Sequence, residues 1–215
     1  RYGGGMYLES SHPILTYMTI HSNSVINEDY ERLGGGIYLS HSNSTFKHST
    51  ISRNTADNGG GLFLEDSNPI FTNSIVWDNS PESIYLSNNS DYSASQPLIS
   101  YSNIEGGWEG EDNINSNPLF TEEYTLQAGS PCIDAGTVIE DMEYCGDFPD
   151  MGAYEYITED CDDCGAELAD VTGDGQINVL DLVQIANLVL EVSTPDYECA
   201  ADYNQDGQVN ILDLV

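Results

Sequence analysis

Positively charged residues are scarce in this 215-residue chain, which has 4 Lys and Arg against 37 Asp and Glu and a formal net charge of −33. Binding to nucleic acid requires Lys and Arg to neutralise phosphates, so this class of partner is excluded. An anionic membrane surface is excluded for the same reason. So acidic a surface suits a salty or calcium-rich medium, because ions there screen the repulsion between carboxylates.

Long apolar segments are missing as well. No stretch reaches the roughly 18 apolar residues that a membrane helix needs, so the sequence predicts no membrane span. The chain begins with Arg1 and stops at Val215 within a repeated pattern, and we expect both ends to be cuts in a longer protein. High net charge often accompanies disorder, but 39% hydrophobic residues, 14 Tyr and regular apolar spacing indicate a folded chain.

Cysteine and histidine are few, and they are separated along the chain. All four His precede residue 50, whereas the five Cys lie in the C-terminal 40% of the chain, which argues against a zinc site and a Cys/His nucleophile pair. Disulfides in an oxidising compartment are the favoured interpretation. The pairs expected are Cys132 with Cys145 and Cys164 with Cys199, with Cys161 as a competing partner and one Cys left over.

A repeat occupies the first 110 residues. The segment that starts with Gly3-Gly4-Gly5 recurs from Gly34 and from Gly59, and a fourth copy without glycines starts at Ser83. Apolar residues recur at the same distances after each triplet, and each set of equivalent positions is called a column. Three short apolar segments per period suit one coil of a parallel β-helix, in which each strand pairs with its counterpart one coil later, about 4.8 Å away.

An Asn stands eighteen residues after the last Gly of each triplet, at Asn23, Asn54 and Asn79. Asn tolerates left-handed backbone angles, and its amide can bond to the Asn of the next coil, so we expect this column to form a ladder at a turn. The Gly triplets are expected to allow tight corners and a close approach of the coils.

The repeat resembles the right-handed parallel β-helix proteins of the pectin-lyase-like superfamily. Segments 117–120, 124–136 and 150–155 look like the closing segment of many secreted members. The resemblance covers residues 1–157 and implies a mainly β fold, a right-handed parallel β-helix. Members that cut polyuronates use paired Asp residues, or calcium with an Arg or Lys base.

No catalytic residue is assigned in the β-helix, and we expect this part of the chain not to be an enzyme. The four Lys and Arg fall at different column positions, and the four His form no stack, so the His are expected to be turn and surface residues. The carboxylate candidates belong to abundant residue types: Glu65, Asp66, Asp134, Asp150 and Glu155. Trp108 is expected in a loop, where it either stacks on a sugar ring or folds back over the last coil.

A calcium-binding motif occurs twice near the C-terminus. Each copy has oxygen-bearing residues at positions 1, 3, 5, 9 and 12, a Gly at position 6 and a backbone carbonyl at position 7, which is the EF-hand loop pattern. The first copy predicts the ligands Asp170, Thr172, Asp174, Gln176, Asn178 and Asp181. The second, 32 residues later, predicts Asp202, Asn204, Asp206, Gln208, Asn210 and Asp213. We therefore expect two calcium sites, the first weakened by the neutral Thr172.

A helix is predicted over residues 179–190, between the two loops. The order of loop then helix, with Asp at position 12, resembles the dockerin type I domain over about residues 165–215. The resemblance implies docking onto a cohesin domain through loop positions 10 and 11. These positions hold Val179, Leu180, Ile211 and Leu212, for which packing of two helices on each other is the alternative role.

The sequence thus predicts a β-helix at 1–157, a linker at 158–168 and a small α-helical, dockerin-like calcium domain at 169–215. The leading hypothesis is an extracellular or cell-surface protein that binds carbohydrate or another surface with its β-helix and attaches through its dockerin-like module. The alternatives are a polysaccharide lyase or glycoside hydrolase carried by the same module, and a calcium-stiffened structural stalk.

Overall fold

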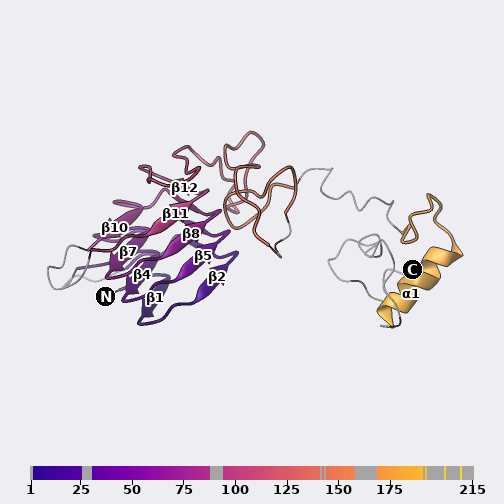
Figure 1. The fold of residues 1–215 in the computed structure, drawn as a ribbon, viewed down its shortest axis with the longest axis horizontal. Coiled ribbons are helices and arrows are strands. Elements are labelled where there is room, and N and C mark those ends of the chain that lie inside the picture. Colours follow the sequence, from indigo (N-terminus) through magenta and orange to yellow (C-terminus); the bar gives the residue numbers. More distant parts are fainter. Residues whose placement is uncertain are drawn as a thin grey trace. The chain divides into compact units, whose positions relative to one another are not determined.

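The computed structural model describes residues 2–25, 31–87, 94–140, 142, 144–157, 169–190, 192, 201 and 209. The chain divides into two compact units, Arg1–Tyr156 and Ile157–Val215. Each unit is considered by itself (Figure 1).

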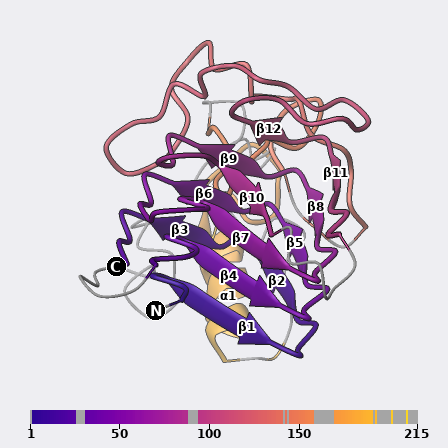
Figure 2. The ribbon, with the colours of Figure 1, turned by 90° about the vertical axis from the view of Figure 1, so that its left-hand side faces the viewer.

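The described part of the first unit contains twelve short strands in three four-stranded parallel sheets. The first sheet consists of β1 (Met6–Glu9), β4 (Ile37–Ser40), β7 (Leu62–Glu65) and β10 (Ile84–Leu86). The second consists of β2 (Ile14–Thr16), β5 (Thr45–Lys47), β8 (Ile70–Thr72) and β11 (Leu98–Ser100). The third consists of β3 (Thr19–His21), β6 (Thr50–Ser52), β9 (Ile75–Trp77) and β12 (Asn103–Ile104). Figure 2 shows the strands of each sheet stacked coil upon coil, so the predicted solenoid is confirmed.

The register of the strands follows the columns predicted from the repeat. Ile37 pairs with Met6 of the preceding coil and with Leu62 of the following one. Leu62 pairs in turn with Ile84, so the fourth copy forms a strand although it lacks the glycines. Each coil bends where a strand ends at a residue with positive φ, for example His41 at 51°. Such a left-handed residue redirects the chain into the next sheet.

The core of the β-helix consists of side chains that point inward from all three sheets. In β4, Ile37 and Leu39 are fully buried in the core, whereas Tyr38 between them lies on the outer face. Like side chains stack on one another in the interior, and the rings of Phe46 and Phe71 lie 4.6 Å apart and nearly parallel. Burial of these columns of apolar surface is the main force that stabilises the solenoid.

The predicted Asn column forms a ladder of hydrogen bonds. Oδ1 of Asn54 accepts from the backbone N–H and Nδ2 of Asn23, at 2.9 and 3.0 Å. Asn54 donates the same two groups to Oδ1 of Asn79, both at 3.0 Å. Nδ2 of Asn54 also donates to the carbonyl of Ile20 at 2.9 Å. The ladder therefore satisfies buried backbone groups at one corner of every coil.

Serine columns form further ladders, which the sequence analysis did not predict. The backbone N–H of Ser42 donates to Oγ of Ser67 at 2.9 Å, and that of Ser67 donates to Oγ of Ser95 at 3.0 Å. A similar column passes through Ser74, whose N–H donates to Oγ of Ser102 at 3.0 Å. Small hydroxyl side chains thus hold the other corners of the coils together.

The glycine triplets have the two roles that were predicted for them. The first Gly has positive φ in each triplet, 66° at Gly34 for example, and makes the corner. The second allows the coils to approach closely, because a Cβ on Gly35 would lie 2.7 Å from both N and C of Thr55.

The second unit contains α1 (Val179–Val189), where a helix was predicted. Asn178 caps the helix by accepting from the N–H of Leu180, and the Asp181 side chain accepts from the N–H of Asn178, which completes a capping box. Ile185 is buried against Val171. None of the helices in the described part of the chain is long and apolar enough to span a membrane.

Candidate functional site

The first predicted calcium loop places two buried carboxylates beside one hydroxyl. Asp170 and Asp181 are 2% and 1% exposed. Oγ1 of Thr172 lies 3.2 Å from Oδ1 of Asp170 and 2.8 Å from Oδ1 of Asp181. The four Lys and Arg of the chain all lie within its first 53 residues, so none belongs to this domain.

Backbone amides hold both carboxylates in place. Asp170 accepts from the N–H of Gly175 at 2.8 Å, and Asp181 accepts from the N–H of Asn178 at 2.8 Å and of Thr172 at 3.1 Å. These donors, Asn178 foremost, hold the pKa of Asp181 below its usual value. The loop therefore stabilises the ionised form of Asp181 at neutral pH.

The remaining predicted ligands of this loop bond within the loop itself. Oδ1 of Asp174 accepts from the N–H of Gln176 at 2.8 Å, and the Gln176 carbonyl accepts from Nδ2 of Asn178 at 3.0 Å. Within the described residues, no group of three or more His, Cys, Asp or Glu side chains is arranged to hold a metal ion. The predicted ligands of the second loop lie outside the described residues: Asp202, Asn204, Asp206, Gln208, Asn210 and Asp213.

The predicted partner residues of the first loop are exposed at the start of α1. Val179 is 70% exposed and Leu180 is 59% exposed, whereas Ile185 of the same helix is buried. Ile211 and Leu212 lie outside the described residues.

The closing segment, residues 118–156, folds back over the outer face of the third sheet. The N–H of Ala153 donates to Oγ1 of Thr50 in β6 at 3.0 Å. The hydroxyls of Tyr124 and Ser22 lie 3.0 Å apart. Ile75 of β9 is fully buried in a second apolar cluster with Met151 of the closing segment. A sheet face that would otherwise meet water is thereby covered.

His48 is one of the residues that this arrangement buries. It is 1% exposed, and its Nε2 lies 3.0 Å from Nδ2 of Asn73. Asn73 in turn bonds to the backbone of Thr137 in the closing segment, at 2.7 and 2.8 Å. Burial lowers the pKa of His48 to about 4. His48 stands at a turn, with φ 44°, but the prediction that the four His are surface residues is wrong for it.

Two carboxylates that were considered as catalytic candidates, those of Asp150 and Glu155, hold the closing segment together. Oδ1 of Asp150 accepts from the N–H of Asp134 at 2.7 Å, and Oδ2 accepts from the N–H of Tyr156 at 2.6 Å. Glu155 accepts from the N–H of Asp150 at 3.1 Å. Burial raises the pKa of Glu155 to about 7. Because these oxygens are occupied by amides of the closing segment, we assign them a structural role.

The predicted bridge between Cys132 and Cys145 is wrong. Cys132 is a free, fully buried thiol beside Met151, and burial raises its pKa to about 11. Nδ2 of Asn103 donates to its Sγ at 3.1 Å. The predicted pair of Cys164 and Cys199 lies outside the described residues.

Aromatic side chains stack along the outer face of the first sheet. The ring of Tyr38 lies 5.4 Å from that of Tyr7 and 4.9 Å from that of Phe63, and Phe63 lies 5.1 Å from Tyr85. Tyr7 is 44% exposed. Trp108 has a different place, since it is half-buried and packs against the core cluster, as in the alternative in which it folds back over the last coil.

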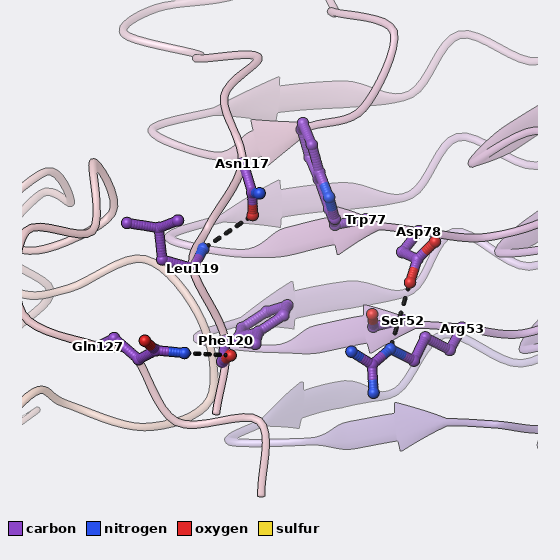
Figure 3. Close-up of a pocket in the computed structure, with 8 residues that line it drawn as sticks. All are labelled: Ser52, Arg53, Trp77, Asp78, Asn117, Leu119, Phe120 and Gln127. Atoms are coloured by element: carbon purple, nitrogen blue, oxygen red, sulfur yellow. Dashed lines mark hydrogen bonds and ion pairs between the residues drawn. The ribbon is translucent and has the colours of Figure 1, made fainter. Parts of the chain in front are cut away.

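A pocket of about 440 Å³ lies between the third sheet and the closing segment (Figure 3). Its lining residues are Ser52, Arg53, Trp77, Asp78, Asn117, Leu119, Phe120 and Gln127. The sequence analysis missed this site. Arg53 and Asp78 both stand seventeen residues after the last Gly of their triplets, so the column rule that found the Asn ladder would have predicted their contact.

Comparison with known families finds two matches. The family model for the right handed beta helix region matches residues 1–117, and the model for the dockerin type I domain matches residues 168–215. Type I dockerin domains generally bind calcium, dockerins bind cohesin domains, and proteins that contain them are typically extracellular or on the cell surface. The comparison with curated proteins gave no match, and neither did the comparison with solved structures.

Proposed function

Because the chain belongs to the right-handed β-helix family and carries a dockerin type I domain, we propose that it is a secreted modular binding protein. Its β-helix binds carbohydrate or another surface, and its dockerin module attaches it to a cohesin domain in the presence of calcium. The observation that carries this proposal is the pair of buried carboxylates, Asp170 in the loop and Asp181 in the first turn of α1, next to exposed apolar residues.

The chemistry of the first loop fits a calcium ion. Asp170 and Asp181 are buried close to each other without a positively charged partner in their domain. Two ionised carboxylates in such a place repel each other, and a divalent cation between them would remove that cost. The side-chain oxygens of Asp170, Thr172, Asp174, Asn178 and Asp181 would hold the ion, together with the carbonyl of Gln176. All of these are hard oxygen donors, which calcium prefers.

The start of α1 supports the docking role. Val179 and Leu180 are exposed directly beside the proposed ion, so calcium would fix the backbone that presents them. Exposed apolar residues at the start of a short helix are suited to a protein interface. The negative charge around them would favour a partner surface with basic residues at its rim.

The outer face of the first sheet supports carbohydrate binding by the β-helix. Tyr7, Tyr38, Phe63 and Tyr85 form a continuous aromatic stack there, in which Tyr7 is 44% exposed and open to a ligand, whereas Tyr38 and Phe63 are 4% and 5% exposed and contribute only by stacking. The carboxylate of Glu65 accepts from the Tyr38 hydroxyl at 2.8 Å. Aromatic faces with nearby hydrogen-bonding groups are suited to the apolar faces and hydroxyls of sugars.

The test is a calcium titration of the EDTA-stripped chain, followed by calorimetry and circular dichroism. We expect saturable binding near two ions per chain, a gain in helix content and a higher melting temperature. Asp170→Ala should lose about one ion per chain. Glu123→Ala, which removes an exposed carboxylate of the closing segment, should leave the stoichiometry unchanged.

A pull-down with immobilised cohesin domains tests the partner. Capture should require calcium, and Leu180→Asp should reduce it at least tenfold while calcium binding persists. Val192→Asp changes an apolar residue that is 68% exposed outside α1, and it serves as the matched control. Flat calorimetric traces, or capture that continues in EDTA, would show that the proposed calcium dependence is wrong.

A further inference from the structure

We propose that the pocket between the third sheet and the closing segment binds one pyranose ring of an uncharged polysaccharide. This inference rests on the proposed carbohydrate-binding function and adds a site for it that is separate from the aromatic stack on the first sheet. The pocket volume of about 440 Å³ lies within the range of small-molecule sites, roughly 300–1,000 Å³. Its lining combines aromatic walls with a few fixed polar groups, as such sites do.

The charged pair in the pocket is held in one orientation. Nε of Arg53 donates to Oδ2 of Asp78 at 3.2 Å, and the guanidinium lies over the ring of Tyr124, 5.4 Å from its centre. Tyr124 is itself held by Ser22 and by the ring of His21, which is 4.2 Å away. Both charged side chains remain about half exposed, at 51% and 63%. They offer a fixed donor and a fixed acceptor to a ligand.

Ser52 supplies an independent indication of a ligand. Its Oγ is buried and has no hydrogen-bond partner among the described residues, although Ser52 lines the pocket, and rotation of this short side chain would turn the hydroxyl towards a ligand there. Most buried hydroxyls in folded proteins have a partner. A sugar hydroxyl in the pocket would supply the missing hydrogen bond.

Aromatic and apolar side chains form the other walls. Trp77 and Phe120 are half-buried against the second apolar cluster, which fixes their rings. Figure 3 shows Arg53, Trp77 and Phe120 around a common space. The apolar C–H face of a pyranose ring packs well on such rings, while its equatorial hydroxyls reach the polar groups at the rim.

The two amide side chains of the pocket are fixed as well. Oδ1 of Asn117 accepts from the N–H of Leu119 at 3.0 Å, and Nε2 of Gln127 donates to the carbonyl of Phe120 at 2.7 Å (Figure 3). Each amide keeps a second group for bonding to a ligand, Nδ2 in Asn117 and Oε1 in Gln127. Because the groups are ordered in advance, a ligand loses less free energy in ordering them.

The charges of the pocket and of the whole chain favour a neutral sugar over an acidic one. The single cation and the single anion that line the pocket neutralise each other, so no free positive charge is offered to a uronate. The net charge of −33 repels polyuronates at long range. The geometry therefore points to an uncharged polysaccharide.

The experiment uses the full chain with Trp108→Phe, which leaves Trp77 as its only Trp. Soluble β-1,4-linked hexasaccharides of glucose, xylose and mannose are titrated with fluorescence and calorimetry, and hexagalacturonate is the charged counterpart. We expect at least one uncharged probe to change the Trp77 emission saturably, with the Kd that calorimetry gives, and hexagalacturonate to have no effect.

Ser52→Ala and Ser44→Ala form a matched pair of variants. Oγ of Ser44 is also buried and has no partner in the described part of the chain, but Ser44 does not line the pocket. Loss of one hydrogen bond should weaken binding about 3- to 10-fold in Ser52→Ala, and Ser44→Ala should bind like the parent. Trp77→Phe, checked for folding by circular dichroism, should weaken binding by a similar or larger factor.

The outcomes separate this site from the proposed function. Calorimetric binding with unchanged Trp77 emission and an unchanged Kd in Ser52→Ala would overturn the pocket as the site, while carbohydrate binding by the β-helix would stand. A response to hexagalacturonate alone would overturn the neutral-sugar assignment. No binding of any probe would count against both, whereas the calcium and cohesin measurements are independent of it.

Discussion

Single polar residues in this fold act through their counterparts one coil away. Asn54 contacts Asn23 on one side and Asn79 on the other, and it also binds a backbone carbonyl, so one side chain connects three coils. Arg53 with Asp78, and Arg32 with Asp57, are ion pairs of the same kind, since each pair spans 25 residues. The contribution of such a side chain to stability therefore depends on the residues at the equivalent position of the neighbouring coils as much as on its own burial.

Asn54→Ala should lower the free energy of unfolding by about 2–4 kcal/mol, because it leaves buried amide and carbonyl groups without partners. Asn43→Ala is the matched control. Its Oδ1 also accepts from the next coil, from the N–H of Asn68 at 2.7 Å, but Asn43 is exposed. The control should lose less than about 1 kcal/mol. Urea unfolding checks both values, and equal losses would show that the ladder has no special role.

His48 should make stability depend on pH. Burial lowers its pKa from 6.5 to about 4 in the folded chain, so the unfolded chain takes up a proton first as the pH falls. The contribution of neutral His48 is therefore complete above about pH 6.5 and is lost as the pH falls towards 4. Between pH 7 and pH 4.5, the parent should lose about 2–3 kcal/mol relative to His48→Gln.

Urea unfolding of both chains at several pH values measures this difference, and the titration of Asp150 and Glu155 largely cancels in it. His12→Gln is the control, because His12 is exposed and its ring stays in contact with water in both states. A difference between parent and His48→Gln that does not change with pH would contradict the burial of a neutral imidazole.

At the scale of elements, strands of two to four residues are stable only as members of a stack. A strand this short has too little apolar surface and too few hydrogen bonds to persist alone. The coils must approach within hydrogen-bond distance all along the turn, and the backbone N–H of Gly35 donates to the Gly59 carbonyl at 2.9 Å. The corners therefore constrain the sequence more strictly than the strands do.

Gly35→Ala should destabilise the β-helix by more than about 3 kcal/mol or prevent it from folding, because the new methyl group would overlap the backbone of Thr55. Gly129→Ala is the control. Gly129 has φ 83°, but apart from its chain neighbours no atom of the described residues lies within 4 Å of an added Cβ. Backbone strain alone should lower the free energy of unfolding of Gly129→Ala by about 1 kcal/mol. Chemical unfolding followed by circular dichroism measures both, and a tolerated Gly35→Ala would contradict the close approach of the coils.

At the scale of the whole molecule, the few positive charges are unevenly distributed along the chain. All four Lys and Arg lie within residues 1–53, and the domain that carries the calcium motifs has none. Self-repulsion of this size destabilises a compact state. Cations from the medium are therefore expected to stabilise this protein. They screen the charges of the β-helix, and we propose that they also bind to the dockerin domain.

Added NaCl should raise the melting temperature by several degrees between 0.01 and 1 M, because the screening length falls from about 30 Å to about 3 Å. Calorimetry in EDTA separates this effect from that of calcium. The increase should shrink at pH 3, where most carboxylates are protonated. A melting temperature that does not respond to salt at pH 7 would mean that repulsion between the carboxylates is locally compensated.

The sequence by itself determined the register of the strands, the Asn ladder and the start of α1. These features are encoded by spacing, since a residue in a solenoid meets the residue one period away, and a helix begins at its capping box. The same rule would have predicted the contact between Arg53 and Asp78. The period of the repeat is thus sufficient to predict the contacts between equivalent residues of neighbouring coils.

Only the tertiary structure decided what the closing segment covers. Its contacts join residues as much as 103 positions apart, such as Asn73 with Thr137 and Thr50 with Ala153, and they do not repeat. They bury His48, keep Cys132 as a free thiol and form the pocket at Trp77. No period in the sequence encodes such contacts, because they depend on the shape of the sheet face onto which the segment folds.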